Sequence, residues 1–119
     1  PNGACGYRIE YGGKVLSICT DTEHYEGKLD EDVMALADNA DVMIYDSAYT
    51  DDEYPKFKGW GHSTWQEALK IAEAANVSKT FLFHHDPSHN DDRMDQIADE
   101  AAAVNSNARP AIEGEEITL

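Results

Sequence analysis

An alternation of short apolar segments with stretches of helical periodicity is the feature that most constrains this fold. Residues 42–45 read Val-Met-Ile-Tyr, a continuous apolar run that is typical of a strand buried on both faces. Similar short runs occupy residues 15–19 and 80–83. Apolar residues recur at helical spacing in residues 29–37, 65–75 and 94–104. Strands that alternate with helices in this way predict an α/β fold.

Local signals mark the ends of these elements. Residues 7–11 and 15–19 flank the pair Gly12-Gly13, which predicts a β-hairpin. Asp30 is placed to cap the first helix, and Ser63-Thr64-Trp65-Gln66 has the form of a capping box at the start of the second. A last strand is expected at residues 116–119. The predicted order is therefore ββαβαβαβ, with a mixed sheet covered by helices on one face.

The acidity of the chain limits its partners. It has 24 acidic and 9 basic residues, and its formal net charge of −15 repels polyphosphates and anionic lipids. Neither a nucleic acid nor a membrane surface is therefore an expected partner. A solvated surface or an adaptation to salt would explain the same acidity, so charge alone does not indicate a cation-binding role.

Length and cysteine usage favour a single cytoplasmic domain. A chain of 119 residues is long enough for one core, so residues 1–119 are expected to form one domain. Cys5 and Cys19 each lie in an apolar run, which argues against a disulfide framework. No apolar run approaches the roughly 20 residues needed to span a bilayer, and no signal-peptide pattern opens the chain. We expect a soluble protein.

Four polar residues are expected to gather at one edge of the sheet. Asp21, Asp46 and His84 each fall at or just beyond the end of a predicted strand, and His62 comes directly before a helix. In α/β sheets that edge is where ligands bind. Carboxylates and imidazoles together suit zinc, manganese or iron. Taken singly, Asp21 is also explained as the start of a turn and Asp46 as a loop cap.

Two further segments have unusual composition. Three histidines and an aspartate cluster in residues 84–89, directly after a strand, although a solvated loop would also explain them. Residues 47–61 form a long irregular segment, which is uncommon unless it borders a site. Tyr54 and Trp60 in this segment are interpreted as packing residues rather than as a substrate pocket. His24 and His89 are interpreted as exposed rather than as extra ligands.

Four motifs, in this order, resemble the later motifs of the metallo-β-lactamase superfamily, in its ribonuclease-Z-like branch: Thr20-Asp21-Thr22, Tyr45-Asp46-Ser47-Ala48-Tyr49, Gly61-His62-Ser63-Thr64 and His84-His85-Asp86-Pro87. By this similarity Asp21 corresponds to the aspartate that bridges two metals, and His84 to the last histidine ligand. His62 corresponds to a histidine that assists proton transfer to the leaving group. Asp46 replaces a more usual glutamate and would orient that imidazole.

The resemblance implies metal-assisted hydrolysis. Two cations polarise the scissile group and lower the pKa of a bridging water, which then attacks. Zinc is the expected metal, with manganese or iron as alternatives. A small phosphodiester or another ester is the expected substrate, although fold alone does not fix the substrate.

The superfamily's His-x-His-x-Asp-His signature does not occur in this sequence. The resemblance therefore implies the C-terminal half of an αβ/βα sandwich, with residues 1–7 similar to the segment that follows a ligand of the N-terminal half. We expect such a fragment to bind metal weakly or not at all, because zinc sites normally use three or four protein ligands, and to be catalytically silent alone.

A lone half would leave one face of its sheet uncovered, and large exposed apolar surfaces are rare in soluble monomers. The expected cover is a second copy, giving a homodimer, or the N-terminal half. The alternative function is a non-catalytic half-domain that serves as an interaction or oligomerisation module. A calcium-buffering domain has little support, because no Asp-x-Asp-x-Asp-Gly loop is present.

Overall fold

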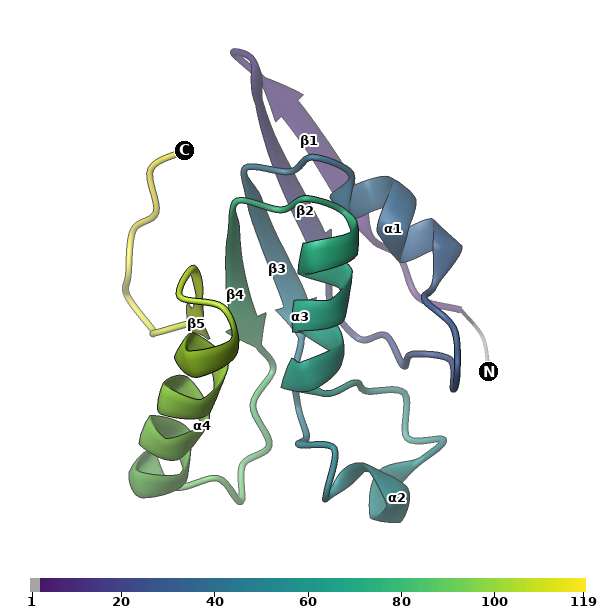
Figure 1. Ribbon diagram of the computed structural model, residues 1–119, viewed down its shortest axis with the longest axis vertical. Coiled ribbons are helices and arrows are strands. Elements are labelled where there is room, and N and C mark those ends of the chain that lie inside the picture. Colours follow the sequence, from purple (N-terminus) through teal and green to yellow (C-terminus); the bar gives the residue numbers. More distant parts are fainter. Residues whose placement is uncertain (1–2) are drawn as a thin grey trace.

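A five-stranded mixed sheet forms the centre of the computed structural model, which describes residues 3–119 (Figure 1). The strands lie across the sheet in their order along the chain: β1 (Tyr7–Tyr11), β2 (Lys14–Cys19), β3 (Val42–Asp46), β4 (Lys79–Phe83) and β5 (Ala108–Pro110). β1 pairs with β2 in an antiparallel hairpin, and the remaining neighbours are parallel. The predicted mixed α/β architecture is therefore confirmed, while Pro1 and Asn2 lie outside the described residues.

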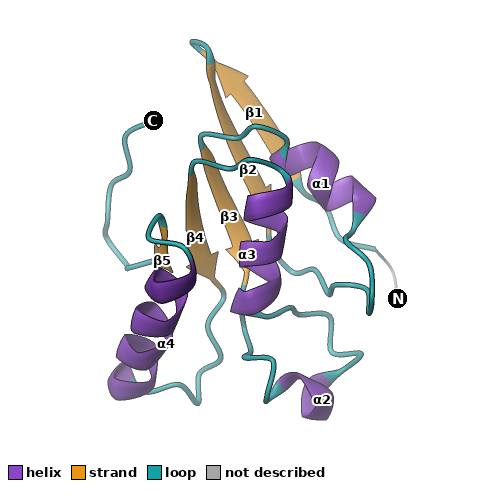
Figure 2. Cartoon of the chain, in the orientation of Figure 1, coloured by secondary structure: helices purple, strands orange, loops and turns teal. Residues whose placement is uncertain are grey.

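Three helices connect the parallel strands and cover one face of the sheet (Figure 2). They are α1 (Glu31–Ala37), α3 (Trp65–Ala74) and α4 (Asp91–Val104). Crossovers between parallel strands are right-handed, so strands added in one direction leave every helix on the same side. Accordingly α1 contacts β2, α3 contacts β3 and β4, and α4 contacts β5. None of the helices in residues 3–119 combines the length and apolarity needed to cross a bilayer.

The core lies between the helices and one face of the sheet. Met43, Tyr45 and Leu82 point to this face and are almost fully buried, together with Ile71 of α3. Side chains on a strand alternate between faces, so the neighbours of these residues point the other way. The strand pairing aligns Tyr7 with Ile18 and Ile9 with Leu16, and this second face is apolar and only partly covered.

Two elements differ from the sequence prediction. The last strand is β5 rather than residues 116–119, which form no strand. The prediction was wrong because β5 is a three-residue strand containing arginine and proline, so its composition is not that of a strand. Its pairing with β4 and the burial of Ala108 stabilise it instead. A short helix, α2 (Tyr54–Phe57), also lies within the segment that was expected to be irregular.

Helix capping agrees with the prediction at α1 and differs at α3. The Asp30 side chain accepts hydrogen bonds from the backbone N–H groups of Asp32 and Val33. At α3 the cap is Thr64, whose Oγ1 accepts from Glu67 N at 3.1 Å. The expected capping box was therefore placed one residue too early. Ser63 is fully buried, and its hydroxyl contacts Tyr45 and His24 instead.

The cap of α1 can be tested by two substitutions at one position. We expect Asp30→Ala to lower the free energy of unfolding by about 1 kcal/mol, because two amide groups lose their acceptor. Asp30→Asn keeps a side-chain oxygen and should stay within a few tenths of a kcal/mol of the wild type. Urea denaturation followed by circular dichroism measures both, and equal losses in the two variants would contradict the capping role.

Candidate metal centre

Asp21, His62 and His84 converge at the carboxyl edge of the sheet. Asp21 follows β2 and His84 follows β4, and these two strands flank β3 in parallel. Their carboxyl ends therefore meet at one edge, and the loop before α3 brings His62 to the same place. One ligand atom from each residue lies within 4.8 Å of the others, and residues 3–119 contain no other such group of three.

The backbone at two of these residues is left-handed. Asp21 has φ of 54° and His84 has φ of 65°. Within the described chain the other non-glycine residues with positive φ are Asn39 and Asn76, which directly follow helical turns, where asparagine is common. The left-handed conformation costs a non-glycine residue about 1–2 kcal/mol. Such strain at two strand ends supports the hypothesis that the convergence of these side chains serves a function.

The three side chains form an accessible set of donors. Nε2 of His84 lies 3.6 Å from Oδ1 of Asp21, and the rings of His62 and His84 stack with centroids 4.3 Å apart. The Asp21 and His84 side chains are 68% and 41% exposed, so an ion or substrate can reach them. One carboxylate and two imidazoles fit zinc, manganese or iron.

Asp46 lies directly behind His62. Its fully buried carboxylate accepts a hydrogen bond from His62 Nδ1 at 2.8 Å through Oδ2, and from Ser63 N at 3.1 Å through Oδ1. An ionised carboxylate only accepts hydrogen bonds, so Nδ1 must carry the proton. In the neutral ring this leaves Nε2 as the nitrogen with a free lone pair. Asp46 therefore fixes the orientation and the tautomer of His62.

The other histidines do not join this group, and the expectation that His24 and His89 are exposed was wrong. His24 Nδ1 lies 2.8 Å from Ser63 Oγ. The His89 side chain is only 4% exposed, and its Nε2 donates to Glu53 at 3.0 Å. His85 is half-buried, and burial lowers its pKa, which favours the neutral ring.

Glu23 is a residue of this region that the sequence prediction missed. Its carboxylate accepts hydrogen bonds from Tyr54 Oη at 2.8 Å, Gly59 N at 2.6 Å and Gly61 N at 3.0 Å. Burial alone would raise the pKa of Glu23, but these hydrogen bonds outweigh it and hold the pKa below its usual value. Nothing in the spacing of Asp21 and Glu23 indicates these contacts.

The long segment contains both packing and exposed aromatics. Tyr54 is buried, which agrees with its interpretation as a packing residue, whereas Trp60 is 67% exposed. A cleft of about 560 Å³ lies beside Asp21, between Gly61 and the side chains of Val33 and Leu36 on α1. Of the three converging residues, Asp21 lines this cleft, whose volume is large enough for a small molecule.

The link between Asp46 and His62 predicts a change of tautomer. In Asp46→Asn, the amide group opposite His62 becomes a donor, so we expect the imidazole proton to move from Nδ1 to Nε2. Ring ¹⁵N chemical shifts of His62 report this move at a pH where the ring is neutral. Asp41→Asn is the control, since Asp41 accepts from Val15 N at a distant site. An unchanged tautomer in Asp46→Asn would contradict the assignment.

Known proteins resemble both the sequence and the fold. Residues 1–85 match the family model of the β-lactamase superfamily domain. The chain is 35% identical over 107 residues to ribonuclease Z of Gemmatimonas aurantiaca, covering 90% of this chain and 32% of that protein.

Two solved structures share its fold. The short form of human tRNase Z matches with a TM-score of 0.69 at 20% identity, covering 95% of this chain and 37% of that one. The metallo-β-lactamase-fold protein YhfI of Bacillus subtilis matches with a TM-score of 0.70 at 23% identity, covering 91% and 41%.

The comparisons also show how much of each relative this chain corresponds to. The chain spans 32% of the length of the Gemmatimonas relative, so it corresponds to about a third of such a protein. The family match covers most of the chain and includes all of the residues that converge on the candidate centre. The chain therefore belongs to the metallo-β-lactamase superfamily, and its sequence is similar to part of ribonuclease Z.

Proposed function

We propose that this chain contributes one side of the metal centre of a hydrolase that cleaves a small phosphodiester or another small ester. The family is one of metal-dependent hydrolases. The observation that carries the proposal for this chain is the convergence of Asp21, His62 and His84 within 4.8 Å at the carboxyl edge of the sheet.

Each residue has a distinct part in the proposed site. Asp21 and His84 hold the cation, since they lie next to each other and are open to solvent. A bound zinc, manganese or iron ion would polarise the scissile bond and lower the pKa of a water molecule. His62 receives or gives a proton at Nε2. Asp46 keeps that nitrogen unprotonated in the neutral ring by accepting from Nδ1.

The ligands on this chain are too few for a two-metal site. Asp21 and His84, with His62 beside them, supply at most three protein donors, whereas each zinc ion normally takes three or four. We propose that the other ligands come from polypeptide outside these 119 residues or from a partner chain. The isolated chain then binds metal weakly and is catalytically silent.

The uncovered face of the sheet is the proposed contact with that partner. Tyr7, Ile9 and Phe83 on this face are 60%, 49% and 44% exposed. The C-terminal residues cover part of this face, where Ile112 and Ile117 line a groove of about 360 Å³ with Phe81. This surface also favours the second candidate function, a non-catalytic module that acts through association alone.

The charge of the chain favours a small substrate. The net charge of −15 disfavours an extended polynucleotide on this part of the protein, although a curated relative is named ribonuclease Z. A compact ester places few negative charges against the chain.

Cys5 and Cys19 are both free thiols, which is consistent with our proposal that the protein works in the cytoplasm.

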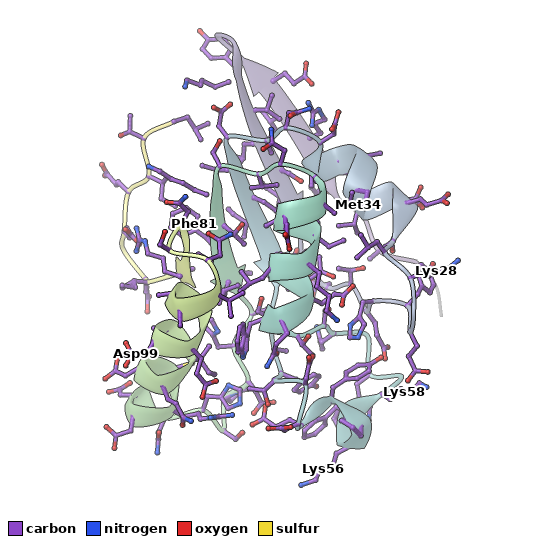
Figure 3. The ribbon with its side chains drawn as sticks, viewed as in Figure 1. Lys28, Met34, Lys56, Lys58, Phe81 and Asp99 are labelled. Atoms are coloured by element: carbon purple, nitrogen blue, oxygen red, sulfur yellow. The ribbon has the colours of Figure 1, made fainter. Side chains whose placement is uncertain are left out.

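Metal binding tests the proposed function. We expect isothermal titration with zinc to give weak binding by the wild type, and at least about tenfold weaker binding by Asp21→Ala and His84→Ala, since even outer partners of a metal site contribute this much. Asp99→Ala is the matched control, because Asp99 is an exposed carboxylate on α4 (Figure 3). Equal binding by all four proteins would count against a metal centre here.

The mass of the isolated chain tests the proposed contact surface. We expect light scattering at micromolar concentration to give twice the chain mass of 13.2 kDa, because a second copy covers the apolar face. Ile9→Lys places a charge on that face and should yield a folded monomer. Val104→Lys changes an exposed apolar residue on α4 and should remain a dimer. A monomeric wild type would rule out the homodimer.

A further inference from the structure

Two loops that carry members of the candidate centre are tied together by one carboxylate. Glu23 lies two residues after Asp21, in the loop that follows β2. Its Oε1 accepts from Tyr54 Oη and Gly59 N, and its Oε2 accepts from Gly61 N. Gly61 directly precedes His62. The three hydrogen bonds therefore connect the loop of Asp21 to the loop of His62.

The backbone of the second loop is shaped to make these contacts. Gly59 and Gly61 have φ of 88° and 90°, a region that residues with a side chain rarely adopt. This conformation turns both N–H groups toward Glu23, while Trp60 between them points to solvent. Hydrogen bonds to an ionised carboxylate are stronger than those between neutral groups. They hold a loop that has little apolar burial of its own.

A neighbouring contact strengthens the connection. Tyr45 Oη donates to Ser63 Oγ at 3.2 Å, and the Ser63 hydroxyl lies 2.8 Å from His24 Nδ1. Ser63 N in turn donates to Asp46. Residues 61–63 are thus held by the loop of Glu23 and His24 on one side and by Asp46 at the end of β3 on the other.

We propose that Glu23 is a positioning residue of the metal centre, which sets the place of His62 relative to Asp21 by fixing the Gly61 amide. The expected effect of Glu23 on metal binding rests on the proposed function. Its effect on the position of His62 does not, because it depends only on hydrogen bonds within this chain. Glu23 lies outside the group of three converging residues, so its proposed action on the site runs through the Gly61 backbone and not through a metal contact.

The chain contains a matched control for this role. Glu26 and Lys58 form an ion pair at 2.8 Å that joins the same two loops. Their side chains are 66% and 56% exposed, and exposed ion pairs contribute little. Glu23 and Glu26 therefore both contact the second loop. Of the two, Glu23 is the one that accepts hydrogen bonds from the backbone beside His62.

The experiment compares Glu23→Gln with Glu26→Gln in ¹⁵N-labelled protein. Glutamine keeps one oxygen, which can still serve Tyr54 and Gly59, but its NH₂ group then faces the Gly61 N–H. We expect Gly61 to exchange its amide hydrogen about tenfold faster in Glu23→Gln, with a shift in the His62 ring ¹⁵N signals. Cobalt(II) titration followed by its visible spectrum should show about tenfold weaker binding. Glu26→Gln should match the wild type in all three measurements.

The outcomes separate this inference from the proposed function. Unchanged Gly61 exchange in Glu23→Gln overturns the inference, and so does faster exchange without a change in the His62 signals. A wild type that fails to bind cobalt counts against the proposed function, while the exchange and ring signals still test the role of Glu23 in the metal-free chain. If Glu23→Gln does not fold, Glu23→Asp withdraws the carboxylate by one methylene and must change the same signals in the same direction.

Discussion

The buried carboxylate of Asp46 is the constraint on which the site depends. A carboxylate with no exposed surface is strongly destabilising unless its oxygens accept hydrogen bonds. The Asp46 oxygens accept hydrogen bonds from His62 Nδ1, from Ser63 N and, at a longer distance, from Ala48 N. Because these donors lie at the two ends of the segment between β3 and α3, satisfying Asp46 also brings both ends of that segment to β3. The end of the central strand therefore organises the edge around it.

Carboxylates also order the long segment between β3 and α3, which buries only a small apolar cluster of its own around Ala48, Tyr49 and Tyr54. Glu23 holds its second half through backbone N–H groups. Glu53 holds its first half, accepting from Thr50 N and from the buried His89. The segment is thus built on polar contacts to neighbouring loops. This explains why its composition suggested an irregular excursion although its path is well defined.

The sequence predicted the parts of this structure that depend on local periodicity or on position along a strand. Strands β1 to β4, helices α1, α3 and α4 and the cap at Asp30 follow from local patterns, and the convergence of Asp21 and His84 follows from parallel strands ending at one edge. The contacts of Glu23 and His89 were not predictable in this way, because each joins residues about 36 apart through a loop conformation. β5 was also not predictable from local sequence, because its stability comes from pairing with β4.

The uncovered sheet face and the incomplete ligand set are linked by the geometry of the strands. Phe83 ends β4 with its side chain on the open face, and the next residue, His84, turns left-handed to bring its ring to the edge. A polypeptide that covers Phe83 and Ile44 must therefore approach the same edge where His84 and Asp21 are exposed. It would remove water from the site, which strengthens electrostatic interactions there, and its own side chains would lie within reach of the proposed cation. Under the proposed function, burial of the apolar face and completion of the metal centre would be a single association step.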